Sequence, residues 1–125
     1  MILKESTEKY YNPILEKSFK FAIRIIRFYK LKLSSDYHLN SLFKQLLRSG
    51  TSIGANVSEA QSAFTKKDFI NKLGISLKES RETEYWLRLL KESEVISLKE
   101  FNSLFSDCEE ISKLLTSIIK SSKSS

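Results

Sequence analysis

The chain has 125 residues, a formal net charge of +6 and 29% charged residues. Three glycines and one proline are too few turn residues for a protein of many short strands. A lone cysteine, Cys108, excludes an internal disulfide. One domain over residues 1–125 is expected. Because neither a signal-like nor a membrane-spanning apolar run is evident, we also expect a soluble cytoplasmic protein with no membrane contact.

Apolar residues three and four apart predict a first helix over about residues 12–33. Asn12 is the expected N-cap, and Pro13 suits the first helical position. The expected buried stripe is Leu15, Phe19, Ala22, Ile26, Tyr29 and Leu33.

A second helix is predicted over about residues 39–62, after the break "LSSD" at 33–36 and with Asn40 as a candidate cap. Its expected stripe is Leu39, Leu42 or Phe43, Leu46, Gly50, Ile53, Val57, Ala60 and Phe64.

The third helix is predicted over about residues 66–93, with Thr65 as N-cap and Asp68 in its first turn. Its expected stripe is Phe69, Leu73, Leu77, Leu87 and Leu90.

The fourth helix is predicted over about residues 97–120, where Ser97 and Glu100 form a capping box and Ile96 and Phe101 a hydrophobic staple. Its expected stripe is Phe101, Leu104, Cys108, Ile111, Leu115 and Ile118, and residues 121–125 are expected to be a frayed tail.

Four long helices with short connections predict an all-α fold, an up-down-up-down antiparallel four-helix bundle. Within it, the glycines fall inside helices, where each costs about 1 kcal/mol relative to alanine. Gly54 and Gly74 lie at equal distances from the turn near Phe64, and Gly50 matches Lys78 in the same way. We therefore expect Gly54 to face Gly74 where the second and third helices approach closely.

The second helix also lacks charge, because Glu59 is the only charged residue between Arg48 and Lys66. Apolar residues lie off the main stripe of the first helix as well. Both helices are therefore expected to be covered on two sides, which favours a homo-oligomer. Ser52, Asn56 and Glu59 share one face of the second helix, and we interpret them as a buried network that fixes packing rather than holding a ligand.

The first helix carries a basic run without an acid from Lys17 to Lys32. Three-and-four spacing places most of these side chains in one stripe that fits a phosphate backbone. An ordinary solvated basic face is the alternative. The candidate nucleic-acid-binding residues are Lys17, Lys20, Arg24, Arg27 and Lys30.

No catalytic residue, cofactor, metal site or small-molecule substrate is indicated. His38 has no second histidine nearby to complete a metal site, and Cys108 lies on an apolar stripe, where a buried, inert thiol is expected. Glu79, Glu82 and Glu84 are spaced for ion pairs on a helix surface, and Lys78–Glu82 and Glu84–Arg88 are the pairs expected.

The stretch "SIGANVSEAQSAFTKKDFINKLGISLKESRETEYWLRLL", residues 52–90, resembles small bacterial four-helix-bundle proteins encoded in intervening sequences of large-subunit (23S) ribosomal RNA genes. The matching features are Ser52-Ile53, Asn56-Val57, Glu59, Lys67, Phe69, Leu73, Ser80, Glu84 and Tyr85-Trp86-Leu87. The resemblance implies a pentamer without enzymatic activity. Related accessory proteins of diversity-generating retroelements are basic, pentameric and nucleic-acid binding.

Together these features lead to the hypothesis of a non-enzymatic oligomer that contacts RNA or DNA through the basic stripe. The alternative is an oligomeric scaffold whose stripe meets an acidic protein surface.

Overall fold

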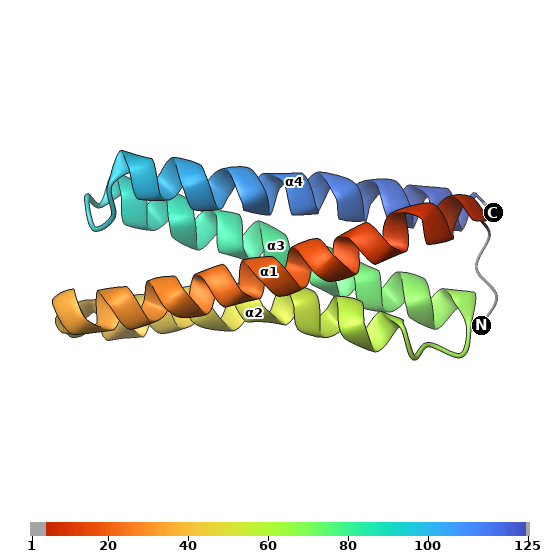
Figure 1. Ribbon diagram of the computed structural model, residues 1–125, viewed down its shortest axis with the longest axis horizontal. Helices are drawn as coiled ribbons and strands as arrows, with labels where there is room; N and C mark the ends of the chain where they lie inside the picture. The colour runs from red at the N-terminus through yellow and green to blue at the C-terminus, as the bar shows by residue number, and fades with distance from the viewer. Residues whose placement is uncertain (1–4, 125) are drawn as a thin grey trace.

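Four long α-helices make up nearly all of the structure, a computed structural model that describes the backbone of residues 5–124 and the side chains of residues 13–124 (Figure 1). The helices are α1 (Glu5–Ser35), α2 (Asn40–Ala60), α3 (Lys66–Glu92) and α4 (Leu98–Lys123). A short 3₁₀ helix, Tyr37–Leu39, joins α1 to α2. No strand occurs within residues 5–124.

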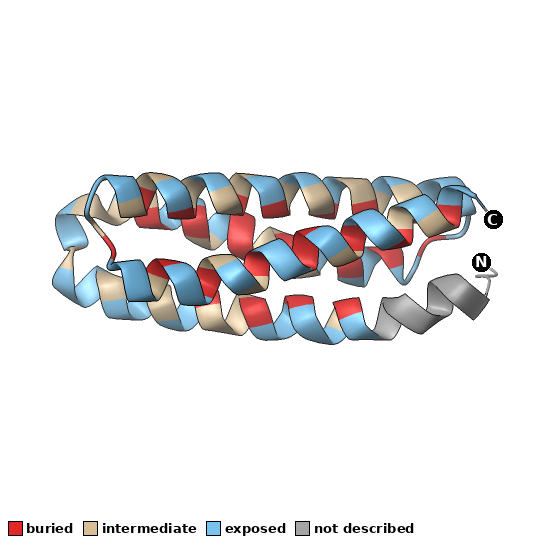
Figure 2. Ribbon diagram, turned by 90° about the horizontal axis from the view of Figure 1, so that it is seen from above, coloured by how far each residue is buried: buried red, intermediate tan, exposed pale blue. Residues whose placement is uncertain are grey.

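Consecutive helices run in opposite directions and are joined at alternate ends of the bundle (Figure 1). α1 packs against α2 and α4, and α3 packs against the same two helices. In the described part of the chain, the diagonal pairs α1–α3 and α2–α4 make no close backbone approach. Buried residues face inward along each helix, and exposed residues face out (Figure 2). The predicted all-α four-helix bundle is confirmed.

The predicted starts of α3 and α4 are correct. Thr65 caps α3 by accepting a hydrogen bond from the Asp68 N–H at 3.0 Å. Ser97 and Glu100 form both bonds of a capping box, at 3.0 and 2.9 Å. At the end of α3, Glu94 adopts a φ of 60°, a value that usually favours glycine.

Other predicted helix ends are wrong. α1 does not begin at Asn12 but already at Glu5, and it continues through Pro13. Pro13 has a fixed φ of helical value, but inside the helix its ring removes one backbone donor and crowds the carbonyl four residues earlier, so its place in α1 is destabilising. The side chain of Asn12 lies outside the described residues.

Asn40 does not cap α2 either. Leu39 occupies the cap position without a side-chain bond, and the Asn40 Oδ1 accepts a hydrogen bond from the Tyr29 hydroxyl at 2.7 Å. α2 ends at Ala60, two residues early, whereas the expected frayed tail is helical to Lys123. It is held by packing, since Ser122 is buried. Ser125 lies outside the described residues.

The stripe predicted for α4 is correct, because all six of its residues are buried. The stripe predicted for α1 is correct only in part, because Leu15 and Tyr29 are half-buried against the core. Phe19, Ile26 and Leu33 are exposed by 67%, 44% and 37%, and Phe21 and Ile25 fill the core instead. α1 is apolar on two flanks, and helical periodicity alone does not show which one faces the bundle. Phe64, expected in the α2 stripe, is 91% exposed beyond the end of that helix.

The apolar stripe predicted for α3 is confirmed at Phe69, Leu73, Leu87 and Leu90, which are buried. A group of buried hydroxyls fills the core-facing positions of α3 between Leu73 and Leu87. Thr83 donates to the Ser49 Oγ at 2.9 Å, and the Ser76 hydroxyl donates to the Ile53 carbonyl at 2.8 Å. The Ser80 and Ser112 hydroxyls lie 2.7 Å apart. The three α3 residues, Ser76, Ser80 and Thr83, are fully buried. Hydrogen bonds thus replace part of the apolar packing between α3 and its two neighbours.

The predicted contact between Gly54 and Gly74 is wrong. A Cβ atom on Gly54 would lie 3.1 Å from the Ser18 carbonyl oxygen of α1, and one on Gly50 would lie 2.9 Å from the Ile25 Cγ1. A Cβ on Gly74 would meet nothing within 4 Å. The predicted alignment of α2 and α3 along the bundle is nearly correct, because the Ser76 hydroxyl of α3 bonds to the Ile53 carbonyl of α2. The close approach, however, lies between α1 and α2.

These glycines provide a matched pair of substitutions. Gly74→Ala adds helix propensity without a clash and should raise the free energy of unfolding by about 1 kcal/mol. Gly54→Ala presses a methyl group against the packed backbone at Ser18. We therefore expect its free energy of unfolding to be about 2 kcal/mol lower than that of Gly74→Ala. Urea unfolding followed by the fluorescence of the single tryptophan, Trp86, measures both. Equal gains in the two variants would contradict the α1–α2 contact.

Glu100 should make the start of α4 sensitive to pH. Burial alone would raise the pKa of this carboxyl, but hydrogen bonds from the Ser97 N–H and from Lys32 outweigh it and hold the pKa below its usual range. The folded pKa is therefore lower than the unfolded value of about 4.3, so the carboxylate stabilises the fold above that pH. This contribution disappears as the pH falls through the folded pKa.

We therefore expect Glu100→Gln to lower the free energy of unfolding by about 0.5–1 kcal/mol at neutral pH. The difference from wild type should shrink in acid. Denaturant titrations on both sides of the carboxyl titration measure it, with the exposed Glu92→Gln as control. A difference that is the same at both pH values would rule out this role for Glu100.

Candidate nucleic-acid interface

The basic stripe of α1 is largely engaged by acidic residues. Lys17 forms an ion pair with Glu110, and Arg24 forms one with Asp107. Farther along α1, Lys32 pairs with Glu100 at 3.0 Å. These pairs join α1 to α4, and the hydrogen bond from Lys17 to Glu110 raises the pKa of that lysine. Much of the stripe therefore serves the contact between the two helices.

The other three of the five candidate residues do not pair with α4. Lys20 pairs within its own helix, with Glu16 at 2.7 Å. Arg27 and Lys30 have no acidic partner among the side chains of residues 13–124. Both are exposed on α1. The sequence places all five in one stripe, whereas the structure leaves a much shorter cationic surface available to a ligand.

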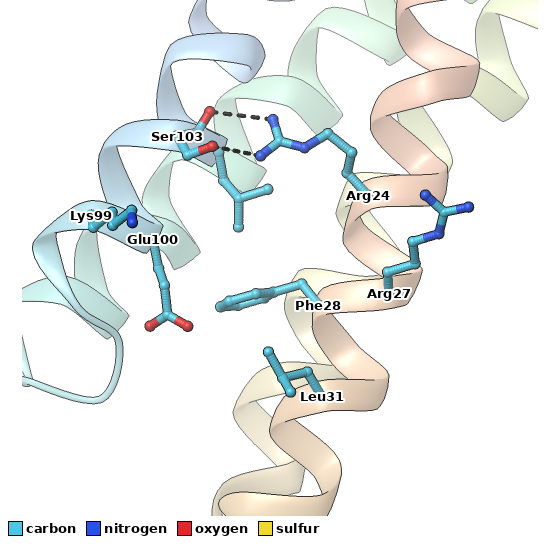
Figure 3. Close-up of a pocket in the computed structure, with 8 residues that line it drawn as sticks. Arg24, Arg27, Phe28, Leu31, Lys99, Glu100 and Ser103 are labelled. Carbon is cyan, nitrogen blue, oxygen red and sulfur yellow. Dashed lines mark hydrogen bonds between the residues drawn. The ribbon is translucent and has the colours of Figure 1, made fainter.

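A groove of about 470 Å³ lies between α1 and α4, beside Arg27 (Figure 3). Its lining residues are Arg24, Arg27, Phe28, Leu31, Lys99, Glu100, Ser103 and Leu104. Phe28 and Leu31 point into the groove from α1, while Arg27 extends outward beside it (Figure 3). The groove therefore combines an apolar floor with basic side chains at its edges.

Hydrogen bonds fix the walls of this groove. The Arg24 guanidinium donates to the Ser103 hydroxyl at 2.6 Å and to the Ser103 carbonyl at 3.3 Å (Figure 3). Phe28 packs edge-on against Phe43, with ring centroids 6.2 Å apart, and the Lys32 Nζ lies 5.5 Å from the Phe28 centroid. A smaller hollow of about 160 Å³ continues along the same seam between α1 and α4, near Lys17. Both hollows thus occur where long side chains bridge these helices.

The outer surface of α2 and α3 is held by a second set of polar contacts. Arg48 donates to both Glu79 oxygens, at 2.8 and 3.1 Å, and also pairs with Glu82. The Trp86 Nε1 donates to Glu82 at 3.1 Å. Hydrogen bonds from Arg48 and Trp86 lower the pKa of Glu82. Arg81 pairs with Glu84 at 3.3 Å. The predicted pairs, Lys78–Glu82 and Glu84–Arg88, are therefore wrong, because Arg48 and Arg81 take these carboxylates.

The polar residues of α2 do not form the expected buried network. Ser52 donates to the Arg48 carbonyl at 2.6 Å, and Asn56 donates to the Ser52 carbonyl at 2.8 Å. Glu59 is exposed and pairs with Lys72 at 3.1 Å. Each side chain thus bonds to nearby backbone or to α3, because the face that carries them is turned outward.

The signal for the real buried network was present in the sequence. On α3 the core-facing positions follow a three-four spacing, from Leu73 through Ser76, Ser80 and Thr83 to Leu87. Small hydroxyl residues at such positions indicate internal hydrogen bonds, because a buried hydroxyl needs a partner.

The remaining candidate groups are placed where chemistry with a ligand is not favoured. Cys108 is fully buried, and burial raises the pKa of its thiol, which donates to the Ser80 carbonyl at 3.3 Å. This agrees with the predicted inert thiol. His38 is exposed in the short 3₁₀ helix. Within the described residues, no three His, Cys, Asp or Glu side chains gather in a way that would hold a metal ion.

None of the described helices has the length and apolar character of a transmembrane segment.

Comparison with known proteins agrees with this bundle. No curated protein matches the sequence. A crystal structure of a protein of unknown function from the S23 ribosomal protein family of Bacteroides thetaiotaomicron is similar, with 49% sequence identity and a TM-score of 0.83. The match covers 89% of this chain and 98% of that one. Residues 12–117 match the family described as 23S rRNA-intervening sequence protein. The chain therefore belongs to the 23S rRNA-intervening sequence protein family.

Proposed function

We propose that the protein is a non-enzymatic homo-oligomer that binds RNA or DNA through phosphate contacts. The observation that carries the proposal is the basic surface formed by Arg27 and Lys30 on α1, with Lys99 at the adjoining groove. None of these three has an acidic partner among the side chains of residues 13–124. We call them the free cations.

The free cations form a better phosphate site than the rest of the stripe. A phosphate that bound Lys17 or Arg24 would compete with Glu110 or Asp107 and would lie beside the carboxylate it displaced. Like charges at such short range repel. Arg27, Lys30 and Lys99 avoid this repulsion, so a polyanion gains their attraction in full.

Exposed apolar residues on α1 support the assembly. Phe19, Ile26 and Leu33 recur at seven-residue intervals and therefore share one flank of the helix. Arg24, which pairs with α4, lies on the other flank. The apolar flank is thus on the side of α1 next to α2, whose outer surface carries few charges. A second copy of the chain is the occupant we propose for this face.

Five-fold assembly is the state that the family resemblance implies. In a ring of five copies, Arg27 and Lys99 of each subunit, with Lys30 at the edge of the subunit contact, would recur at regular intervals around the assembly. A nucleic acid that touches several copies would then bind more tightly than one copy allows.

The groove contains an acidic side chain whose bonds hold the start of α4. Glu100 is the only carboxylate that lines it among the described residues. That carboxylate already accepts the Ser97 N–H and pairs with Lys32. A general acid or base must be able to exchange its proton with a substrate, and these bonds oppose protonation of Glu100.

The phosphate contacts are tested by a triple variant, Arg27→Glu, Lys30→Glu, Lys99→Glu. We expect the affinity for a fluorescein-labelled single-stranded RNA, measured by fluorescence anisotropy, to fall at least tenfold at low salt. The slope of log K against log salt should fall in magnitude by about 2, because each phosphate contact on a single strand contributes about 0.7.

The control is Lys67→Glu, Lys78→Glu, Arg88→Glu on α3, which makes the same change in net charge with exposed residues. An equal loss in the control would show that overall charge, not this surface, holds the RNA. RNA binding that is absent in the wild type would instead favour the protein-scaffold alternative.

The assembly is tested by Phe19→Lys, Ile26→Lys. Two charges on the apolar flank should prevent a second copy from packing there, so light scattering should show a shift toward the 14.5 kDa monomer. Phe64→Lys, which changes an aromatic residue that is 91% exposed beyond the end of α2, should leave the assembly intact. A wild type that is monomeric at micromolar concentration would refute the interface.

A further inference from the structure

The groove between α1 and α4 holds apolar surface where phosphate contacts alone would need none. Leu31 is 59% exposed although it lies beside basic residues, and Phe28 points into the same space (Figure 3). Leu104 completes the floor from α4. An apolar floor of this kind gains free energy only when a ligand with an apolar face covers it.

The charges around this floor favour an anionic ligand. Arg27 and Lys99 are free cations, and Arg24 keeps its guanidinium at the wall by bonding to Ser103. Among the residues whose side chains are described, Glu100 is the one acid that lines the groove, and Lys32 pairs with it at 3.0 Å. The ligand that fits is therefore apolar on one face and negatively charged at an edge, with room for a group of moderate size.

We infer that this groove takes an unpaired nucleobase, with the flanking phosphates on Arg27 and Lys99, and that the protein therefore prefers single-stranded to double-stranded nucleic acid. The inference rests on the proposed function, because it assigns a substrate class to the same surface.

Base pairing explains the preference. In a duplex the faces of the bases are stacked on their neighbours, so only the phosphate and sugar edges can reach the groove. In a single strand a base can leave the stack and lie against an aromatic or apolar side chain, which strengthens binding to any sequence. Phe28 and Leu31 supply that surface, while the free cations hold the backbone on either side.

Two variants change the floor without changing charge. Leu31→Ser removes an exposed apolar side chain and should leave the fold intact. Phe28→Leu keeps an apolar group against Phe43 but removes the ring. Thermal unfolding followed by circular dichroism checks the fold of each. The matched controls are Leu98→Ser, which changes another exposed leucine, and Phe64→Leu, which removes an exposed ring beyond the end of α2.

The experiment measures the binding of one labelled RNA, alone and annealed to its complement, by fluorescence anisotropy at the same salt concentration. We expect the wild type to bind the single strand about tenfold more tightly than the duplex. Leu31→Ser and Phe28→Leu should each weaken single-strand binding about fivefold or more and leave duplex binding and the salt slope unchanged. The two controls should behave like the wild type.

Equal binding of the two RNAs by the wild type would overturn the inference, as would an unchanged preference in Leu31→Ser. If either of these results accompanied a loss of RNA binding in the triple free-cation variant, the phosphate-binding function would stand and only the base site would be refuted. No binding of either RNA by the wild type would remove both.

Discussion

The absence of side chains at Gly50 and Gly54 lets α1 lie directly against α2, and the rest of the surface of α1 follows from this contact. Because the Ser18 carbonyl lies only 3.1 Å from where a Gly54 Cβ would be, any side chain at this position would press the two helices apart. The opposite side of α1 reaches α4 mainly through long side chains, and the hollows lie there. One close contact thus determines which flank of α1 carries the groove and which one remains apolar and exposed.

The sequence was sufficient for the parts of the fold that depend on local chemistry. The caps at Thr65 and Ser97 involve residues three apart, and the stripe of α4 has one apolar face and therefore one possible orientation. It was insufficient for α1, whose two apolar flanks make the choice between Phe19 and Phe21 depend on the neighbouring helix. The predicted contact between Gly54 and Gly74 was wrong for a similar reason. Their level along the bundle can be counted from a turn, but their partner depends on rotation about the helix axis.

The candidate site could be predicted only in part. A basic run without acids in sequence was correctly recognised, but whether its charges are available depends on acids about ninety residues away, such as Glu110 opposite Lys17. No spacing rule relates the two positions. Lys99 and the apolar floor could not be found from the sequence at all, because the groove exists only where α1 and α4 diverge.

The buried hydroxyls along α3 have a further consequence for how the helices align. Leucines can exchange one apolar neighbour for another, so an apolar bundle tolerates a shift of one helix by two turns. A buried hydroxyl cannot exchange its neighbours in this way, because it needs a hydrogen-bond partner at a defined position. If α3 slid along α2, Ser76 would leave the Ile53 carbonyl and Thr83 would leave Ser49. Thr83 would keep its bond to the Glu79 carbonyl within α3, but Ser76 would be left buried without its partner, at a cost of about 1–3 kcal/mol. Ser76 therefore acts against misaligned packings more than it adds to the stability of the correct one.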